Sequence, residues 1–237
     1  LLEQDYQTAT SYFDLSTNFA EQELHPVYVN QTPYSIVYSI FHLAWTYVQM
    51  GYEERAIETM NLLVERKKYS PFAESNARTH RAEIYALIFD YTAAIQDLDE
   101  AIALIKTEHL NLLSQLFKQR GDIIMLIYEW NRALEDYNTA IELDPDYAEA
   151  YYRRGILLYT MVEREDAIAD FETYLEIVPD GQFAESASKY IEDISSATGA
   201  DKLIAQPKGF GPPGTTGNTL SQNDIDLDQS WLSDHIL

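Results

Sequence analysis

The feature that most constrains the fold is a pair of small residues that recurs along the chain at one fixed separation. Each pair is a glycine or alanine followed twelve residues later by an alanine. The four pairs are Ala44 and Ala56, Ala82 and Ala94, Gly121 and Ala133, and Gly155 and Ala167. A small residue is needed where two helices approach too closely for a larger side chain, so the repeated pair predicts one helical hairpin copied in tandem.

Other residues keep the same register within each copy. A bulky apolar residue stands four residues after each second alanine, and another apolar residue follows three positions later. The first set is Met60, Leu98, Tyr137 and Phe171, and the second is Leu63, Ala101, Ala140 and Tyr174. In the last two copies Pro145 and Pro179 end the unit, because proline cannot continue a helix.

The distance between copies is not constant. It is 34 residues from Gly121 to Gly155, but 38 from Ala44 to Ala82 and 39 from Ala82 to Gly121. Because the interval of twelve never changes, we expect the four or five extra residues to lie between hairpins, around KKYSPF and KTEHLN.

With these landmarks in place, the chain resembles the tetratricopeptide repeat family. Residues 148–181 match the family motif through Tyr151, Gly155, Leu158, Ala167, Phe171 and Pro179. Residues 114–147 match it through Gly121, Ala133, Tyr137, Ala140 and Pro145. The copies at 75–108 and 37–70 have alanine in place of glycine and lack the final proline in register. The resemblance implies an all-α, right-handed superhelical solenoid of antiparallel helix pairs, with about four full repeats.

The amino-terminal residues 1–36 leave two interpretations open. The stretch DYQTATSYFDL is similar to the second helix of a repeat, through Tyr6, Ala9 and Phe13, but no first helix precedes it. We expect either a partial repeat or an irregular cap, followed by a loop between Pro26 and Pro33. Because the first residue is not Met, a fragment of a longer protein with an upstream domain, signal peptide or membrane anchor is a further open interpretation.

After the fourth copy, QFAESASKYIEDISSAT has apolar residues at helical spacing and predicts a capping helix that closes the stack. The apolar positions are Phe183, Ala187, Tyr190, Ile191 and Ile194. The solenoid with its cap is therefore expected over residues 37–197. Residues 198–237 contain GFGPPGTTGNT and predict a flexible acidic tail. The last stretch, DIDLDQSWLSDHIL, contains apolar residues again. This segment could dock on the scaffold of its own chain or recruit a separate protein, and the sequence leaves both interpretations open.

Composition narrows the classes of partner. The chain has 39 Asp and Glu against 16 Lys and Arg, a formal charge of −23 that runs through the repeats. The electrostatic field of so many negative charges repels nucleic acid, so we expect no nucleic-acid partner. No run approaches the ~20 apolar residues that span a bilayer, so we expect no membrane insertion by this chain. A cytoplasmic location is favoured, with an extracytoplasmic, membrane-anchored location open if an upstream segment exists.

The sequence contains no pattern typical of catalysis. There are no cysteines, and the five histidines are scattered without zinc-ligand spacing. Asp224, Asp226 and Asp228 alternate like the start of a calcium loop, but Gln229 replaces the glycine and His235 the closing glutamate. No phosphate-binding glycine loop or nucleophile elbow is present. We therefore expect no catalytic residue, no metal site and no cofactor.

A binding surface remains as the predicted function. The resemblance implies a concave groove lined by the first helix of each hairpin, and helical periodicity selects the side chains that face it. The predicted partner-binding residues are Tyr38, Phe41, His42, Trp45, Asn76, His80, Lys118, Asp122, Tyr152, Arg153, Ile156 and Tyr159. Aromatic side chains on such a surface are typical of hot spots. The alternative is that they pack against loops, the amino-terminal segment or a neighbouring repeat.

The sequence thus predicts a non-catalytic scaffold whose groove binds a peptide or helical segment of another protein. The alternative is a regulatory or substrate-docking part of a larger enzyme or membrane-anchored assembly, and self-association is a third possibility. Family members that grip the carboxylate end of chaperone tails use a clamp of Lys, Asn and Arg. Lys118, Asn76 and Arg153 could contribute to one here, but Glu83, Asp122 and Glu149 oppose them, so this type of ligand is not expected.

Overall fold

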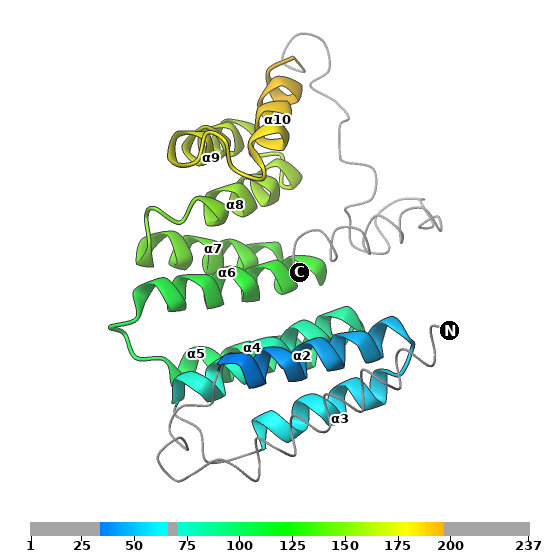
Figure 1. Ribbon diagram of the computed structural model, residues 1–237. Coiled ribbons are helices and arrows are strands. Elements are labelled where there is room, and N and C mark those ends of the chain that lie inside the picture. Colours follow the sequence, from blue (N-terminus) through cyan, green and yellow to red (C-terminus); the bar gives the residue numbers. More distant parts are fainter. Residues whose placement is uncertain (1–33, 66–70, 197–237) are drawn as a thin grey trace. The chain divides into compact units, whose positions relative to one another are not determined.

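The computed structural model describes residues 34–65 and 71–196 (Figure 1), and within these ranges it contains nine α-helices and no strand. The predicted all-α class is confirmed. The expected amino-terminal partial repeat and the acidic tail lie outside the described residues, apart from the first residues of α2.

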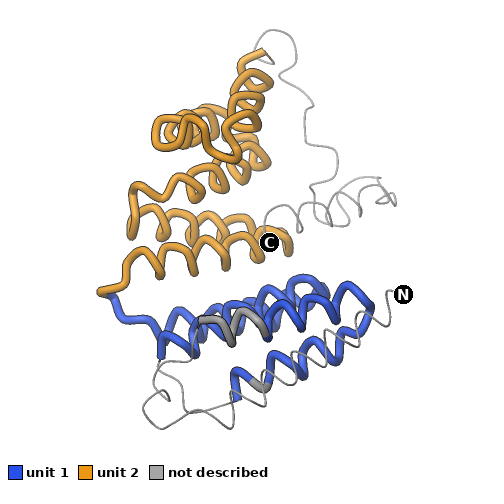
Figure 2. The backbone as a smooth tube through the Cα atoms, in the orientation of Figure 1, with its two compact units in different colours: residues 1–107 blue, residues 108–237 orange. Residues whose placement is uncertain are grey.

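The helices form consecutive pairs that pack against each other. The pairs are α2 (Tyr34–Gln49) with α3 (Glu53–Val64), α4 (Pro71–Leu87) with α5 (Tyr91–Leu104), α6 (Leu110–Leu126) with α7 (Trp130–Leu143), and α8 (Ala148–Thr160) with α9 (Arg164–Ile177). A last helix, α10 (Ala184–Ser196), packs on α9. The chain divides into two compact units, residues 1–107 and 108–237 (Figure 2). Unit 1 holds the first two hairpins, and unit 2 holds the last two with α10.

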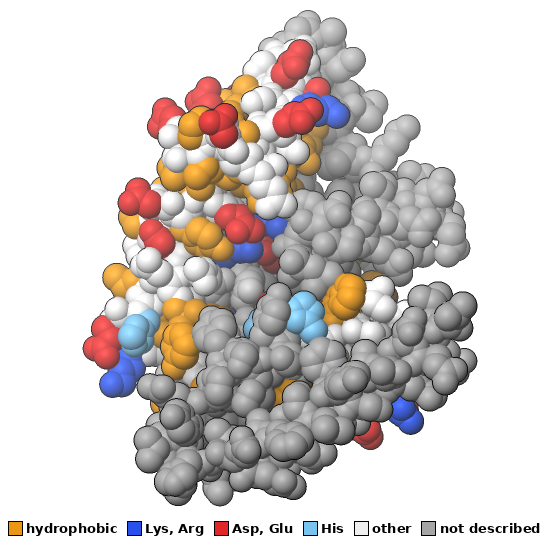
Figure 3. Space-filling model, in the orientation of Figure 1, with side chains coloured by type: hydrophobic (Ala, Val, Ile, Leu, Met, Phe, Trp, Pro, Cys, Tyr) orange, Lys and Arg blue, Asp and Glu red, His pale blue; other side chains and the backbone are white. Residues whose placement is uncertain are grey.

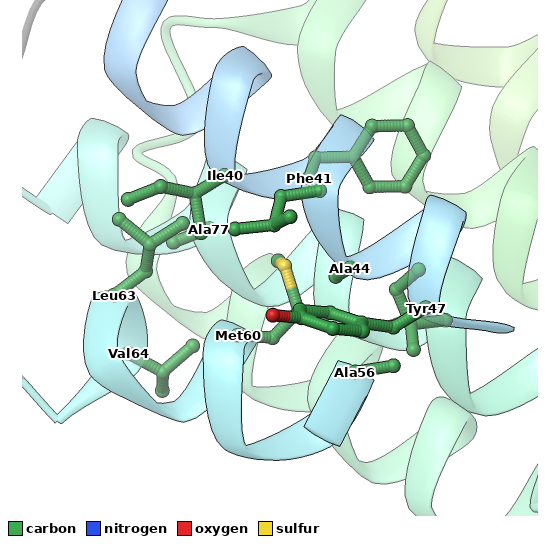
Figure 4. Packing of buried hydrophobic residues seen from close by; sticks show 11 residues of the cluster. Ile40, Phe41, Ala44, Tyr47, Ala56, Met60, Leu63, Val64 and Ala77 are labelled. Atoms are coloured by element: carbon green, nitrogen blue, oxygen red, sulfur yellow. The ribbon is translucent and has the colours of Figure 1, made fainter. Parts of the chain in front are cut away.

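The small residues lie where the sequence predicts close helix contacts. A Cβ atom added at Gly155 would lie 2.9 Å from Cε1 of Phe171, and one added at Gly121 would lie 2.9 Å from Cε1 of Tyr137. In unit 1 the corresponding Ala44 is fully buried and lies beside Met60 (Figure 4). The four bulky landmark residues are at most 1% exposed. The register assigned from the sequence is therefore confirmed.

The placement of the extra residues was predicted wrongly in part. Helices α4 and α6 each have 17 residues, against 13 in α8, so four of the added residues extend the start of each helix instead of lengthening a loop. In α4, Pro71 is preorganised for the first helical turn and Glu74 complements the amino-terminal dipole. In α6, Leu113 is buried, so packing favours the added turn.

Each hairpin turn contains one residue in the left-handed backbone region, seven residues after the small residue. Gly51 has φ 75°, Phe89 φ 63°, Tyr128 φ 62° and Val162 φ 68°. A left-handed residue commonly ends a helix, and glycine occupies this conformation without a Cβ penalty. The three side-chain-bearing residues occupy it at a cost of roughly 1–2 kcal/mol each.

The predicted capping helix is confirmed as α10. Its residues Ala187 and Ile194 are buried against unit 2, and Tyr190 and Ile191 pack on the same cluster. The Tyr190 ring stacks on Phe171 at a centroid distance of 5.0 Å. The helix therefore covers the apolar end of the last hairpin.

Candidate functional site

The predicted partner-binding residues fall on the first helices of the hairpins in both units. We call Phe41, His42, Trp45, Asn76 and His80 on α2 and α4 the unit-1 face. We call Lys118, Asp122, Tyr152, Arg153, Ile156 and Tyr159 on α6 and α8 the unit-2 face. Tyr38 lies in α2, but its side chain is outside the described residues.

The centre of the unit-1 face is an aromatic stack between two helices. The Phe41 ring of α2 stacks on the His80 ring of α4 at 4.5 Å, and His42 lies tilted against Phe41 at 5.5 Å. Phe41 is only 5% exposed and belongs to the core cluster of unit 1 (Figure 4). This burial favours the packing interpretation for Phe41, whereas His42, Trp45, Asn76 and His80 stay partly exposed.

Polar groups border this stack. Nδ1 of His80 lies 3.0 Å from Oε2 of Glu83, one turn further along α4. The Trp45 ring packs against the core cluster, and its Nε1 is a buried donor that has no hydrogen-bond partner in the part of the chain that the structure describes. The unit-1 face thus combines fixed aromatic rings with polar atoms that retain bonding capacity.

The unit-2 face is organised around a buried charge cluster. Nζ of Lys118 lies 2.8 Å from Oε1 of Glu149 and 3.3 Å from Oδ2 of Asp122. Arg153, only 1% exposed, lies 3.8 Å from Asp122 and 3.7 Å from Glu149. The Tyr137 hydroxyl donates to Asp122 at 2.8 Å. Two cations and two carboxylates therefore meet within one unit.

The pKa shifts in this cluster show which effect dominates. Burial alone would lower the pKa of Lys118, but the nearby charge of Asp122, with Glu149, outweighs it and raises that pKa. Burial would likewise raise the pKa of Glu149, yet Lys118 holds it below its usual value. Both groups are thus kept charged by each other. This agrees with the expectation that Asp122 and Glu149 oppose the cations that a carboxylate ligand would need.

The aromatic residues of the unit-2 face pack against the carboxyl-terminal part of the unit. Tyr152 is 3% exposed and stacks on Phe183 at 4.4 Å. Tyr159 lies against Tyr190 of α10 at 5.2 Å, and Ile156 packs on the same cluster. Whether the residues of either face contact a partner stays a prediction.

A repeated arrangement that sequence reasoning missed is an ion pair between the two helices of a hairpin, which we call the Arg–Asp clasp. In each clasp the Nε and Nη2 atoms of an arginine donate to the two oxygens of one aspartate, at 2.6–2.9 Å. The clasps are Arg81 with Asp97, Arg120 with Asp136, and Arg154 with Asp170. This bidentate geometry is the strong form of the interaction.

Two of the clasps also reach the preceding hairpin. Nη1 of Arg81 donates to Asn61 of α3 at 2.8 Å, and Nη1 of Arg154 donates to Asn138 of α7 at 2.8 Å. The sequence signal is an arginine immediately before the small residue and an aspartate three residues after the second alanine. The first copy has Leu43 and Thr59 there instead. These partly buried ion pairs therefore join the two helices of a hairpin and, at Arg81 and Arg154, also join it to the preceding hairpin.

Neither a membrane span nor a metal cluster is found in the described ranges. No helix there combines the length and the apolar character needed to cross a bilayer. Within residues 34–65 and 71–196, no three His, Cys, Asp or Glu side chains are placed together to hold a metal ion. On the face shown in Figure 3, Asp and Glu side chains are spread over the described surface and do not gather in one patch.

One family model, described as a TPR repeat, matches residues 125–162, and another, described as a tetratricopeptide repeat, matches residues 37–69. A search of curated proteins found no match.

Among solved structures, the chain is similar to BtubC (BKLC) from P. vanneervenii, with a TM-score of 0.63 and 17% identity over 93% of this chain and 98% of BtubC. At this identity the likeness shows the fold alone. Two smaller structures are also similar. The first TPR domain of Spaghetti (RPAP3), bound to an HSP90 peptide, is 23% identical over 53% of this chain and 96% of its own, with a TM-score of 0.47. The second TPR domain of human RPAP3, in complex with an HSP70 peptide, is 25% identical over 53% and 98%, with a TM-score of 0.46.

Proposed function

Because the chain is a tetratricopeptide repeat protein, we propose that it is a non-catalytic interaction scaffold that binds a peptide or helical segment of another protein on its first-helix faces. Its partner is a protein, since a chain of net charge −23 repels nucleic acid. The buried charges support a non-catalytic role, because the Arg–Asp clasps and the Lys118 cluster serve packing between helices.

The observation that carries the proposal is the unit-1 face. Trp45, His42, Asn76 and His80 are partly exposed on two adjacent helices, although residues between them, such as Ala44 and Ala77, are fully buried in the core. A rigid aromatic surface with polar atoms at its border is the composition of a peptide-binding hot spot. The unit-2 face has less accessible area, because Tyr152 and Arg153 are buried.

The proposal can be tested without knowing the natural partner. Dodecapeptides are selected from a random phage-displayed library against the full chain, synthesised with a fluorescent label, and measured by anisotropy. Trp45→Ala should weaken binding by ~2 kcal/mol or more if this residue is a hot spot. Circular dichroism on the same samples checks that helicity is retained.

The matched control is Trp130→Ala, because Trp130 is also a partly buried tryptophan but begins α7, a second helix. Its replacement should leave peptide affinity within about twofold of the parent chain, the range expected away from a hot spot. Failure to select any peptide, or equal losses in both variants, would contradict binding at the first-helix faces.

A further inference from the structure

The turn between α6 and α7 forms a pocket that belongs to neither first-helix face. Its volume is about 410 Å³, within the range of ligand pockets. The lining combines two aromatic and four polar side chains and contains no aliphatic one: Tyr128, Glu129, Trp130, Asn131, Arg132 and Glu135. This composition favours a ligand that is recognised by aromatic rings and by charge.

The aromatic side chains are kept at this turn against the preference of the backbone. Tyr128 has φ 62°, in the left-handed region, where the first hairpin has Gly51. A bulky residue is uncommon in this region, and strained positions of this kind cluster at ligand sites. Trp130 follows as the first residue of α7 and is partly exposed. Both aromatic residues therefore line a pocket that solvent reaches.

The charge of the lining is negative, since it holds two carboxylates and one guanidinium. Nη1 of Arg132 lies 2.7 Å from Oε2 of Glu129, and both side chains are about half exposed. Exposed ion pairs are weak, so a ligand cation can take the place of Arg132 at little cost. Glu135 is exposed and is not part of this pair. An anionic ligand would face both carboxylates and the field of a chain of net charge −23.

We propose that this pocket binds an arginine side chain of a partner protein, a contact beyond those of the first-helix faces. A guanidinium is a planar cation that stacks on aromatic rings and donates to a carboxylate through two N–H groups, whereas lysine is a compact point charge. The Arg132–Glu129 pair shows that the rim accommodates a guanidinium beside a carboxylate. The bound guanidinium lies against Trp130 and Tyr128 and donates to Glu135.

The test uses the full chain labelled with ¹⁵N at the indole groups of its three tryptophans. Titration with Nα-acetyl-arginine methylamide should shift the Trp130 indole signal saturably, with half-saturation at roughly millimolar ligand for a molecule of this size. The Trp45 signal should stay in place. The citrulline analogue has nearly the same shape without the charge and should bind at least fivefold more weakly. The spectrum of Trp130→Phe assigns the signal.

Two substitutions test the charged groups in opposite directions. Glu135→Gln should weaken the arginine ligand severalfold and flatten the dependence of its affinity on salt. Arg132→Gln should strengthen binding severalfold, because it removes the cation that competes for Glu129. Glu142→Gln, at an exposed position further along α7, is the matched control and should leave the affinity unchanged.

Three outcomes would overturn the proposal. They are the absence of a saturable Trp130 shift, equal affinity for the citrulline analogue, and tighter binding of Nα-acetyl-glutamate methylamide than of the arginine derivative. None of them bears on the first-helix faces, which Trp45→Ala tests. A saturating concentration of the arginine derivative during the dodecapeptide selection blocks this pocket, so Trp130→Ala remains a neutral control for those faces.

Discussion

Replacing Gly155 with alanine tests the close helix contact that defines the repeat. In the middle of an exposed helix, glycine to alanine normally stabilises by ~1 kcal/mol. At this position the new Cβ would lie 2.9 Å from Cε1, 3.1 Å from Cδ1 and 3.1 Å from Cζ of Phe171. The Phe171 ring is fully buried, with Tyr190 stacked on it at 5.0 Å and Tyr152 tilted against it at 5.8 Å, so it has little room to retreat.

The expected effect follows from these two opposed contributions. Overpacking a close contact costs about 1–3 kcal/mol, which exceeds the gain of ~1 kcal/mol in helix propensity. We therefore expect Gly155→Ala to lower the free energy of unfolding by about 1 kcal/mol, measured by urea denaturation with far-UV circular dichroism. Hydrogen exchange of the α8 amides localises the loss, since repeat proteins can open one part at a time.

A second substitution supplies the stringent comparison. The copies with alanine at this position have Met60 and Leu98 opposite, whereas the copies with glycine have Tyr137 and Phe171. Phe171→Leu should therefore relieve the clash, and the double variant should be more stable than the sum of the single effects by ~1 kcal/mol or more. Ala169→Gly, at an exposed position of α9, measures the propensity contribution alone. A stabilising Gly155→Ala, or strictly additive effects, would refute the reasoning.

Three further predictions concern the clasps, the turns and the charge cluster. Arg154→Met should lower the free energy of unfolding by about 3 kcal/mol, because it leaves the buried Asp170 carboxylate without its bidentate partner. Arg132→Met, which removes an exposed pair with Glu129, should cost less than ~1 kcal/mol, and equal losses in urea denaturation would contradict a structural role for the clasp. Val162→Gly should raise the melting temperature, since relief of roughly 1–2 kcal/mol of left-handed strain exceeds the ~0.5–1 kcal/mol entropic cost of glycine, and a lower melting temperature would count against strain there. Since the pKa of Glu149 is lowered in the folded state, its contribution to stability is present above the unfolded pKa and is lost as the pH falls through the folded pKa. Thermal melts between roughly pH 5 and pH 3 should therefore show a smaller loss for Glu149→Gln than for the parent chain, and identical losses would exclude this linkage.

The sequence predicted the parts of the fold that rest on side-chain volume. Gly155 and Phe171 are sixteen residues apart, and their contact follows from the helix period and the turn length. The same period placed Ala187 and Ile194 on the buried side of the capping helix. The limit on side-chain volume applies at the same helix contact in every repeat. A single sequence therefore shows it as a periodic pattern of small and bulky residues.

Other features leave a weaker signal because several residue types satisfy them. The left-handed turn position holds Gly51 in one copy but Val162 in another, so the turn geometry overrides the local preference of the side chain. The added turn of α4 starts at Pro71, a residue that marks loop and helix start equally well in a sequence. The Arg–Asp clasp has a regular spacing of sixteen residues, yet charged residues in a repeat are ordinarily assigned to the solvent side.

The burial of single side chains in the candidate site could not be predicted from helical periodicity. Helical periodicity placed Phe41 and Trp45 on one side of α2, but it does not distinguish the ring that fills the core from the ring that borders it. That distinction depends on the partner helix: His80 of α4 covers Phe41. The same holds for Tyr152, which is buried because Phe183 stacks on it.

The two faces differ in what their polar groups have left to bind. On the unit-2 face, Lys118 is already engaged by Asp122 and Glu149, so a ligand carboxylate must displace one of them and expose a buried charge. On the unit-1 face, His42, Trp45 and Asn76 are partly exposed, and His80 lies beside the Glu83 carboxylate without a buried ion pair to separate. This difference supports our proposal that α2 and α4 carry recognition, and it favours a mainly stabilising role for the cluster between α6 and α8.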